Sequence, residues 1–241
     1  MNVEVVVYNF ESVVIAETCG ATRVELCANE GAGGTSPSVS LLEKIKANTS
    51  IPVFVMVRPR EGDFTYSELE MDLILSEIAL FKQTGASGIV CAALTKNAEV
   101  DVVNVTKMVQ AAHPLPFTFH RAVDHVAEPF TALEQLIDCG CARILTSGQE
   151  PSVFEGQDLV KQLIETANGR ICILPGAGVN SKNVKEIVDF TGCSEIHLSA
   201  KKMMQRTVVL NNKIQLGSSN DTNAYQLTDE IELKRVLEIL S

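Results

Sequence analysis

A strand-like run recurs eight times along this sequence, and each copy is followed by a segment that reads as helix. The runs begin at residues 3, 23, 53, 88, 117, 142, 170 and 195, so neighbouring starts lie 20 to 35 residues apart. That interval fits a strand, a loop, a helix and a second loop. Helical spacing of apolar residues is visible over 40–48, 68–85, 102–112, 129–140 and 183–192. Eight such units in 241 residues predict an α/β fold, a single-domain (β/α)8 TIM barrel with parallel strands over residues 1–241.

The alternative fold is an open doubly wound sheet, which usually carries a glycine-rich dinucleotide turn after its first strand. The corresponding segment here reads YNFES, residues 8–12. Residues 201–228, between the eighth run and a closing helix at 232–240, show no clear period and are expected to be irregular. In a barrel they would lie over the C-terminal mouth, as a lid or an oligomer contact.

The net charge and the hydropathy of the sequence indicate which kinds of partner the protein is not expected to bind. A net charge of −10 argues against nucleic acid, which is bound through clustered Lys and Arg. No apolar run is long enough to cross a bilayer, and the N-terminus MNVEVVVYN lacks the features of a secretory signal. We therefore expect a cytoplasmic protein with no membrane partner. Its seven cysteines are expected to remain thiols, since an odd number does not make a disulfide framework.

Alternation within four runs predicts which side chains face the barrel interior. In a barrel strand one parity packs against the helices and the other points inward. The apolar parity is clear in the runs from residues 23, 53, 117 and 195, which leaves mainly polar groups for the interior. The inward set is Arg23, Glu25, Cys27, Met56, Arg58, Arg60, Thr118, His120, His197 and Ser199.

Arg58, Arg60 and His120 come late enough in their strands to reach the C-terminal mouth, where barrels of this kind place their binding and catalytic groups. Buried charges need partners, so Glu25 and Arg58 are expected to pair. A blander interpretation is a polar core layer whose members satisfy one another without a ligand.

Glycine-bearing strand ends add a second signal. The sequence TSG, residues 146–148, ends the sixth run, and GAGV, residues 176–179, ends the seventh. Loops at these places in barrels often hold phosphate through backbone N–H groups. With three arginines nearby, they predict a small-anion site that includes Arg58, Arg60, Arg121, Ser147, Gly148, Gly176, Gly178, His197 and Ser199.

Metal-binding patterns are weak. Cys139 and Cys141 form a Cys-X-Cys, which can bind soft metals, but they fall at the face opposite the mouth and are expected to be structural. The chain has no CxxC and no HExxH, so spacing alone identifies no metal site.

Several motifs occur together and in order: VELCAN (24–29), GGTSPS (33–38), VRPREGDF (57–64), FTFHRAVD (117–124), RILTSG (143–148) and GAGV (176–179). In this combination the chain resembles the CutC copper homeostasis protein family over roughly residues 1–200. The resemblance implies a cytoplasmic TIM barrel, usually a homodimer or higher homo-oligomer, associated with copper tolerance and Cu(I). Some relatives place a cysteine in strand one beside the one in strand two. Here strand one is VEVVVYN, so Cys27 lacks that partner and His120 would have to help hold copper.

Three hypotheses follow. The first is a copper homeostasis protein of the CutC type that binds Cu(I) directly through Cys27 or affects copper indirectly. The second is an enzyme acting on a small anionic or phosphorylated metabolite at the mouth, with His120 as general acid or base and Glu25 or Asp124 as its carboxylate partner. The third is an oligomeric interaction protein whose mouth has no ligand. Whether the chain is an enzyme stays open at this point.

Overall fold

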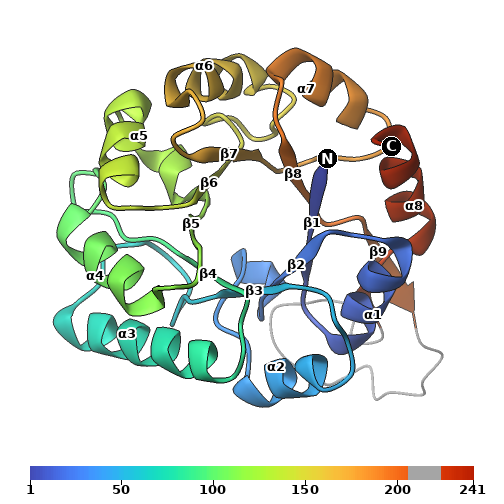
Figure 1. Ribbon diagram of the computed structural model, residues 1–241, viewed down its shortest axis with the longest axis horizontal. Coiled ribbons are helices and arrows are strands. Elements are labelled where there is room, and N and C mark those ends of the chain that lie inside the picture. Colours follow the sequence, from blue (N-terminus) through green and yellow to red (C-terminus); the bar gives the residue numbers. More distant parts are fainter. Residues whose placement is uncertain (206–223) are drawn as a thin grey trace, which may run out of the picture.

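Eight parallel strands form an inner ring in the computed structural model, which describes residues 1–205 and 224–241 (Figure 1). Hydrogen bonding runs in the order β7-β6-β5-β4-β3-β2-β1-β8, and β7 and β8 pack side by side where the ring closes. The predicted barrel is therefore confirmed over the open doubly wound sheet. The strands are β1 (Asn2–Val7), β2 (Arg23–Leu26), β3 (Val53–Met56), β4 (Gly88–Cys91), β5 (Phe117–Phe119), β6 (Arg143–Thr146), β7 (Cys172–Pro175) and β8 (Glu195–Leu198).

Helices surround this ring, one after each strand (Figure 1). Their ends follow ordinary capping chemistry: Asn9 caps α1 through Ser12 N–H, and Ser67 with Glu70 forms a capping box at α3. The helices are α1 (Phe10–Cys19), α2 (Val39–Lys46), α3 (Glu68–Gln83), α4 (Val102–Ala112), α5 (Pro129–Asp138), α6 (Gln157–Ala167), α7 (Val184–Thr191) and α8 (Glu230–Ile239), with short 3-10 turns η1 (Glu30–Ala32) and η2 (Arg121–His125). None of the described helices is long and apolar enough to span a membrane.

A charged layer fills the interior near the N-terminal ends of the strands. Arg23 donates to both Glu4 and Glu195, and Arg143 also donates to Glu195. Both guanidinium groups lie 5.1 Å from the centre of the Phe54 ring. Gly88 makes room for that ring, because a Cβ on it would stand 2.6 Å from the Phe54 side chain. These contacts fill the barrel interior at the end opposite the C-terminal ends of the strands.

The segment expected to be irregular has strands at both described ends. β9 (Lys201–Gln205) and β10 (Ala224–Thr228) pair antiparallel, with Lys201 opposite Thr228. The pairing is anchored where Asp229 N–H donates to Ala200 O and Thr228 N–H donates to Ser12 Oγ. These bonds bring the two ends of the segment together, which sequence periodicity does not show. The expected lid or oligomer contact falls mainly on residues 206–223, outside the described residues.

Candidate functional site

A cavity of about 140 Å³ opens above the charged layer, at the C-terminal ends of the strands. The strands β1, β2, β3, β6 and β8, with the turns that follow β1, β2, β3 and β5, supply its walls. This is the end of the barrel where the sequence predicted the site. Its lining residues are Val6, Tyr8, Glu25, Cys27, Gly33, Met56, Arg58, Phe64, His120, Arg121, Leu145 and His197.

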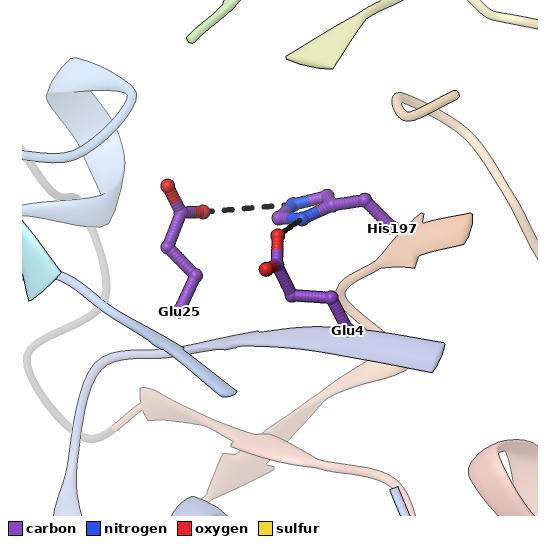
Figure 2. Close-up of side chains that lie close together, drawn as sticks. All are labelled: Glu4, Glu25 and His197. Carbon is purple, nitrogen blue, oxygen red and sulfur yellow. Dashed lines mark hydrogen bonds and ion pairs between the residues drawn. The ribbon is translucent and has the colours of Figure 1, made fainter. Parts of the chain in front are cut away.

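Two carboxylates hold the His197 imidazole between them (Figure 2). Nδ1 lies 2.8 Å from Glu4 Oε1, and Nε2 lies 3.7 Å from Glu25 Oε2. The strand register produces this arrangement, because Glu4 on β1 is aligned with His197 on β8 and with Arg23 on β2. These three side chains, called the Glu4–His197–Glu25 string below, are all buried. Glu4 is 1%, Glu25 3% and His197 8% exposed.

The pKa values of the string differ according to the neighbours of each group. Burial raises the pKa of Glu25 to about 7, with the Glu4 charge adding to the rise and His197 opposing it. Burial also disfavours ionised Glu4, but the hydrogen bond and charge of His197 and the charge of Arg23 outweigh it and lower the Glu4 pKa. The pKa of His197 is raised against the effect of burial by the Glu4 hydrogen bond and the Glu25 charge. The charge of Glu25 and the charge of His197 therefore each affect the pKa of the other group.

His120 is a neutral hydrogen-bond donor. Its Nδ1 accepts from Ala122 N–H at 3.1 Å, so the ring proton of the neutral imidazole is on Nε2. That Nε2 is buried and has no hydrogen-bond partner among the described residues. Burial, followed by the charge of Arg58, lowers the pKa of His120 to about 3. His120 thus enters the cavity wall as an N–H donor that lacks an acceptor.

Asp124 makes its hydrogen bonds to residues of the neighbouring loops and not to His120. It accepts hydrogen bonds from Arg121 Nε at 2.8 Å and from the backbone N–H of Ser147 at 3.2 Å, and also from the Thr146 hydroxyl. Neither Asp124 nor Glu25 makes a hydrogen bond to His120 in the described structure. The carboxylate partner expected for His120 is therefore not in place.

Arg58 lies in the cavity wall, 6% exposed, with its guanidinium used mainly to fix loops. It donates to the carbonyl oxygens of Ala32, Gly34 and Gly62, each at 2.8 Å, and stacks 4.9 Å from the centre of Phe64. No carboxylate among the described residues lies within ion-pair distance of it, so the expected Glu25–Arg58 pair is not formed. Its Nε is buried without a hydrogen-bond partner in the same part of the chain.

The other two arginines predicted for the site, Arg121 and Arg60, lie in different positions relative to the cavity. Arg121 lines the cavity and bonds Asp124 and Ser147 Oγ, each at 2.8 Å. Arg60 lies outside the lining, 36% exposed, and pairs with Glu70 and Asp63 on the outer rim. The alternation that turned Arg60 inward fails because β3 ends at Met56. Arg58, two residues beyond the end of β3, still follows the alternation, but Arg60, four residues beyond it, does not.

The TSG and GAG loops also lie outside the cavity lining. Ser147 Oγ donates to Glu150 O at 2.6 Å, and a Cβ on Gly148 would stand 2.1 Å from Gly156 O. Their polar groups and close backbone contacts thus hold neighbouring loops together. Of the remaining predicted residues, Gly176 and Gly178 pack against neighbouring side chains, and Ser199 lines a separate small space beside β10.

The donor groups of the site fit a Cu(I) ion poorly. Glu4, Glu25 and His197 offer atoms within 4.8 Å of one another, close enough to hold a cation. Two carboxylates and an imidazole suit harder divalent ions, whereas Cu(I) prefers sulfur. Both Glu4 oxygens also already accept, one from Arg23 and one from His197. Cys27 brings sulfur to the cavity, but burial and the Glu25 charge raise its pKa well above the ordinary value, which disfavours the thiolate that binds metal.

Glu4 is the residue of the string that sequence reasoning did not select. Its signal was present, because Val3, Val5 and Val7 form an apolar parity in β1 that turns Glu4 and Tyr8 inward. Phe64 follows β3 in a loop, where no periodicity could place it against Arg58.

Comparison with known proteins gives a consistent result. A model of the CutC family matches residues 1–202. A CutC family protein of Glaesserella parasuis is 41% identical over 241 residues, 100% of this chain and 99% of the relative. The copper homeostasis protein cutC homolog of Homo sapiens is 42% identical over 225 residues, 93% of this chain and 82% of the relative. The solved CutC structure from Streptococcus agalactiae superposes with a TM-score of 0.79 at 30% identity, covering 83% of this chain and 98% of that one.

Proposed function

This chain belongs to the CutC family of copper homeostasis proteins, and we propose that it is an enzyme that carries out acid–base chemistry on a small anionic compound, with any effect on copper being indirect. The observation that carries the proposal is the Glu25 carboxylate. Its Oε2 faces His197, while its buried Oε1 has no hydrogen-bond partner among the described residues and belongs to a cavity wall. A buried carboxylate oxygen without a partner is costly unless a ligand or proton satisfies it.

Anion binding is supported by the arginines of the wall. Arg58 is a buried cation with no carboxylate in ion-pair reach among the described residues. Arg121 adds a second guanidinium, which is paired with Asp124 and 45% exposed. Burying a charge without a counter-charge is unfavourable, so an anionic ligand would stabilise this wall. On a protein with a net charge of −10, Arg58 is the cation in this cavity whose charge no carboxylate within ion-pair distance balances among the described residues.

The proton-transfer part is supported by the pKa of Glu25, which burial raises to about 7. A group with a pKa near the working pH can both take and return a proton. Glu4 fixes the orientation of His197, which faces Glu25 from the other side.

Cavity size limits the ligand. A cavity of about 150 Å³ in another protein accommodates benzene, a six-carbon ring. The 140 Å³ here therefore suits a buried portion of about six non-hydrogen atoms, with further groups extending toward the mouth. Small hydroxy acids, keto acids and short sugar phosphates are of this size.

Thermal-shift measurements with inorganic phosphate, glycolate, pyruvate and dihydroxyacetone phosphate test the proposal. We expect at least one anion to stabilise the protein, and Arg121→Gln to reduce the shift. Arg60→Gln is the matched control, because it removes the same charge from the rim outside the cavity lining. Stabilisation by no anion, or equal loss in both variants, would count against the proposal.

Direct Cu(I) binding is the second candidate, favoured by one observation. Cys27 and Met56 both line the cavity, and both lie near Gly34, where a Cβ would stand 3.3 Å from Cys27 Sγ and 3.6 Å from Met56 Cε. Anaerobic titration of the reduced protein with Cu(I) tests it, with Cys27→Ser as the variant and Cys172→Ser, outside this cavity, as the control. A submicromolar site lost only in Cys27→Ser would establish direct binding, and its absence would leave copper effects indirect.

We also propose a cytoplasmic homo-oligomer. The described cysteines are all free thiols, which suits a reducing compartment. Leu69 and Leu73 of α3 and Val103 of α4 are exposed, Leu69 by 81%, and these apolar side chains could be covered by a second copy. Light scattering coupled to size-exclusion chromatography checks this, with a monomer at micromolar concentration contradicting it.

A further inference from the structure

We propose that the substrate is a carbonyl compound, enolised between two residues of the cavity: His120 Nε2–H binds the carbonyl oxygen, and Glu25 Oε1 takes the proton from the neighbouring carbon. This inference rests on the proposed function and names its substrate class and reaction.

The His120 side chain is set up to donate and not to accept. Its Nδ1 is occupied by Ala122 N–H at the start of η2, which leaves the proton on Nε2. Phe64 flanks the imidazole with ring centres 5.0 Å apart, and the described residues provide no acceptor for Nε2. A fixed donor in a water-poor site stabilises the negative oxygen of an enolate more strongly than the neutral carbonyl, which is what lowers a barrier.

Glu25 supplies the complementary group on the other side of the ring of strands. It comes from β2, whereas His120 follows β5, and both line the same cavity. Its buried Oε1 has no partner among the described residues, so taking a proton there would break no existing hydrogen bond. A carboxylate base opposite a neutral imidazole donor is an arrangement suited to proton abstraction beside a carbonyl.

Enolisation transfers a proton from a substrate carbon to the Glu25 carboxylate. Glu25 Oε1 removes a proton from the carbon next to the carbonyl, and the C–H electron pair forms the C=C bond of the enolate. The carbonyl π pair moves to oxygen, which accepts from His120 Nε2–H. Glu25 then returns a proton to the same carbon, which is seen as exchange once the carboxyl proton has been replaced from solvent. When the substrate is an α-hydroxy carbonyl, Glu25 can instead return the proton to the former carbonyl carbon while the hydroxyl proton passes to the former carbonyl oxygen, which gives isomerisation. No oxidant or reductant is consumed.

The arginines define the rest of the substrate. Arg121 lies next to His120 in the chain and lines the cavity, and buried Arg58 completes this positive wall. A carboxylate or phosphate attached to the carbonyl compound would meet these groups. Three- or four-carbon keto acids and ketose phosphates combine such an anion with an acidic C–H.

Proton NMR in D2O tests the inference with pyruvate, 2-oxobutyrate and dihydroxyacetone phosphate as probes. We expect protein-dependent exchange of the C–H next to the carbonyl in at least one probe. Glu25→Gln should lower the exchange rate at least about 10²-fold. His120→Ala should lower it about 10²- to 10³-fold, whereas His120→Gln, which keeps an N–H donor, should retain more. Arg60→Gln, changed outside the cavity, should exchange like wild type.

The outcomes separate the two proposals. Arg121-dependent stabilisation by anions, without exchange above the buffer rate in wild-type protein, would overturn enolisation and leave anion binding in place. Exchange that persists in Glu25→Gln, or equal rates in His120→Ala and His120→Gln, would overturn the assigned roles. Failure of every anion to bind would remove the proposed function itself. Circular dichroism of each variant separates loss of chemistry from loss of fold, and the wild-type measurement decides the case where a variant does not fold.

Discussion

His197 and Glu25 face each other across 3.7 Å, imidazole Nε2 to carboxylate Oε2, on strands that both flank β1. Neither residue is more than 8% exposed. Two titratable groups at this separation cannot change charge independently, so the pair behaves as one proton-holding unit beside the cavity.

Stability should fall as pH rises because of Glu25. Its pKa of about 7 lies above the ordinary value of 4.5, so between these values the folded protein holds a proton that the unfolded chain has released. The contribution is fully present below pH 4.5 and is lost as pH rises through about 7. Glu25→Gln should remove this dependence and be more stable than wild type at pH 8 by up to about 3 kcal/mol, relative to their difference at pH 4.5. Urea unfolding at both pH values measures it, and parallel pH profiles for the two proteins would contradict it.

The pKa values of His120 and His197 should be shifted in opposite directions from that of a free histidine. Burial and Arg58 lower the pKa of His120 to about 3, so its ring should stay neutral, with the proton on Nε2, from pH 8 down to pH 5. The pKa of His197 is raised above 6.5, mainly by its hydrogen bond to Glu4 in opposition to burial, so it should gain charge earlier as pH falls. Nitrogen-15 NMR of histidine-labelled protein reports both, with signals assigned by their loss in His120→Gln and His197→Gln. A His120 ring that becomes charged above pH 5 would refute the donor role.

Arg23 should be far more important for stability than an exposed arginine of the same kind. Its replacement by Met would leave Glu4 and Glu195 buried without their shared cation, which should cost about 3–5 kcal/mol. Arg170→Met is the matched control, because it breaks an exposed pair with Glu134 and should cost no more than about 1 kcal/mol. Chemical denaturation of both variants gives the comparison. Similar losses in the two would show that the charged layer does not support the barrel.

Gly88→Ala should destabilise the layer beneath the cavity. The added methyl group would stand 2.6 Å from the ring of Phe54, the residue of β3 that is aligned with Gly88 on β4. This ring contacts Arg23 and Arg143. Overpacking of this kind costs about 1–3 kcal/mol. Gly169→Ala is a useful contrast because no heavy atom lies within 4 Å of its added Cβ, although its φ of +75° brings a backbone cost. A thermal midpoint unchanged in Gly88→Ala would contradict the tight packing.

The barrel was predictable because its signal is spread over the whole chain. Eight strand-like runs, each followed by a helical pattern, indicate the same fold. Alternation in four of them predicts the side chains that reach the cavity, among them Glu25, Cys27, Arg58, His120 and His197. Contacts between side chains were not predictable in this way. Whether Arg58 pairs with Glu25 or with three loop carbonyls depends on the path of the loops after β2 and β3, which carry no period. The same absence of a repeating pattern explains two wrong expectations. Arg60, beyond the end of β3, and the TSG and GAG loops are expected in the site from the sequence but lie outside the cavity lining.

The central claim is that an anion binds beside a proton-holding pair, and calorimetry tests it most directly. Pyruvate and glycolate should be titrated into the protein at pH 7.5 in two buffers of different ionisation heat. These two ligands are chosen because their own carboxylate groups stay ionised near that pH. A bound anion favours the protonated form of the Glu25–His197 pair, so binding should take up protons and the measured heat should depend on the buffer. Glu25→Gln should abolish most of this proton uptake. Binding heats that are equal in both buffers, or a proton uptake unchanged in Glu25→Gln, would contradict the account.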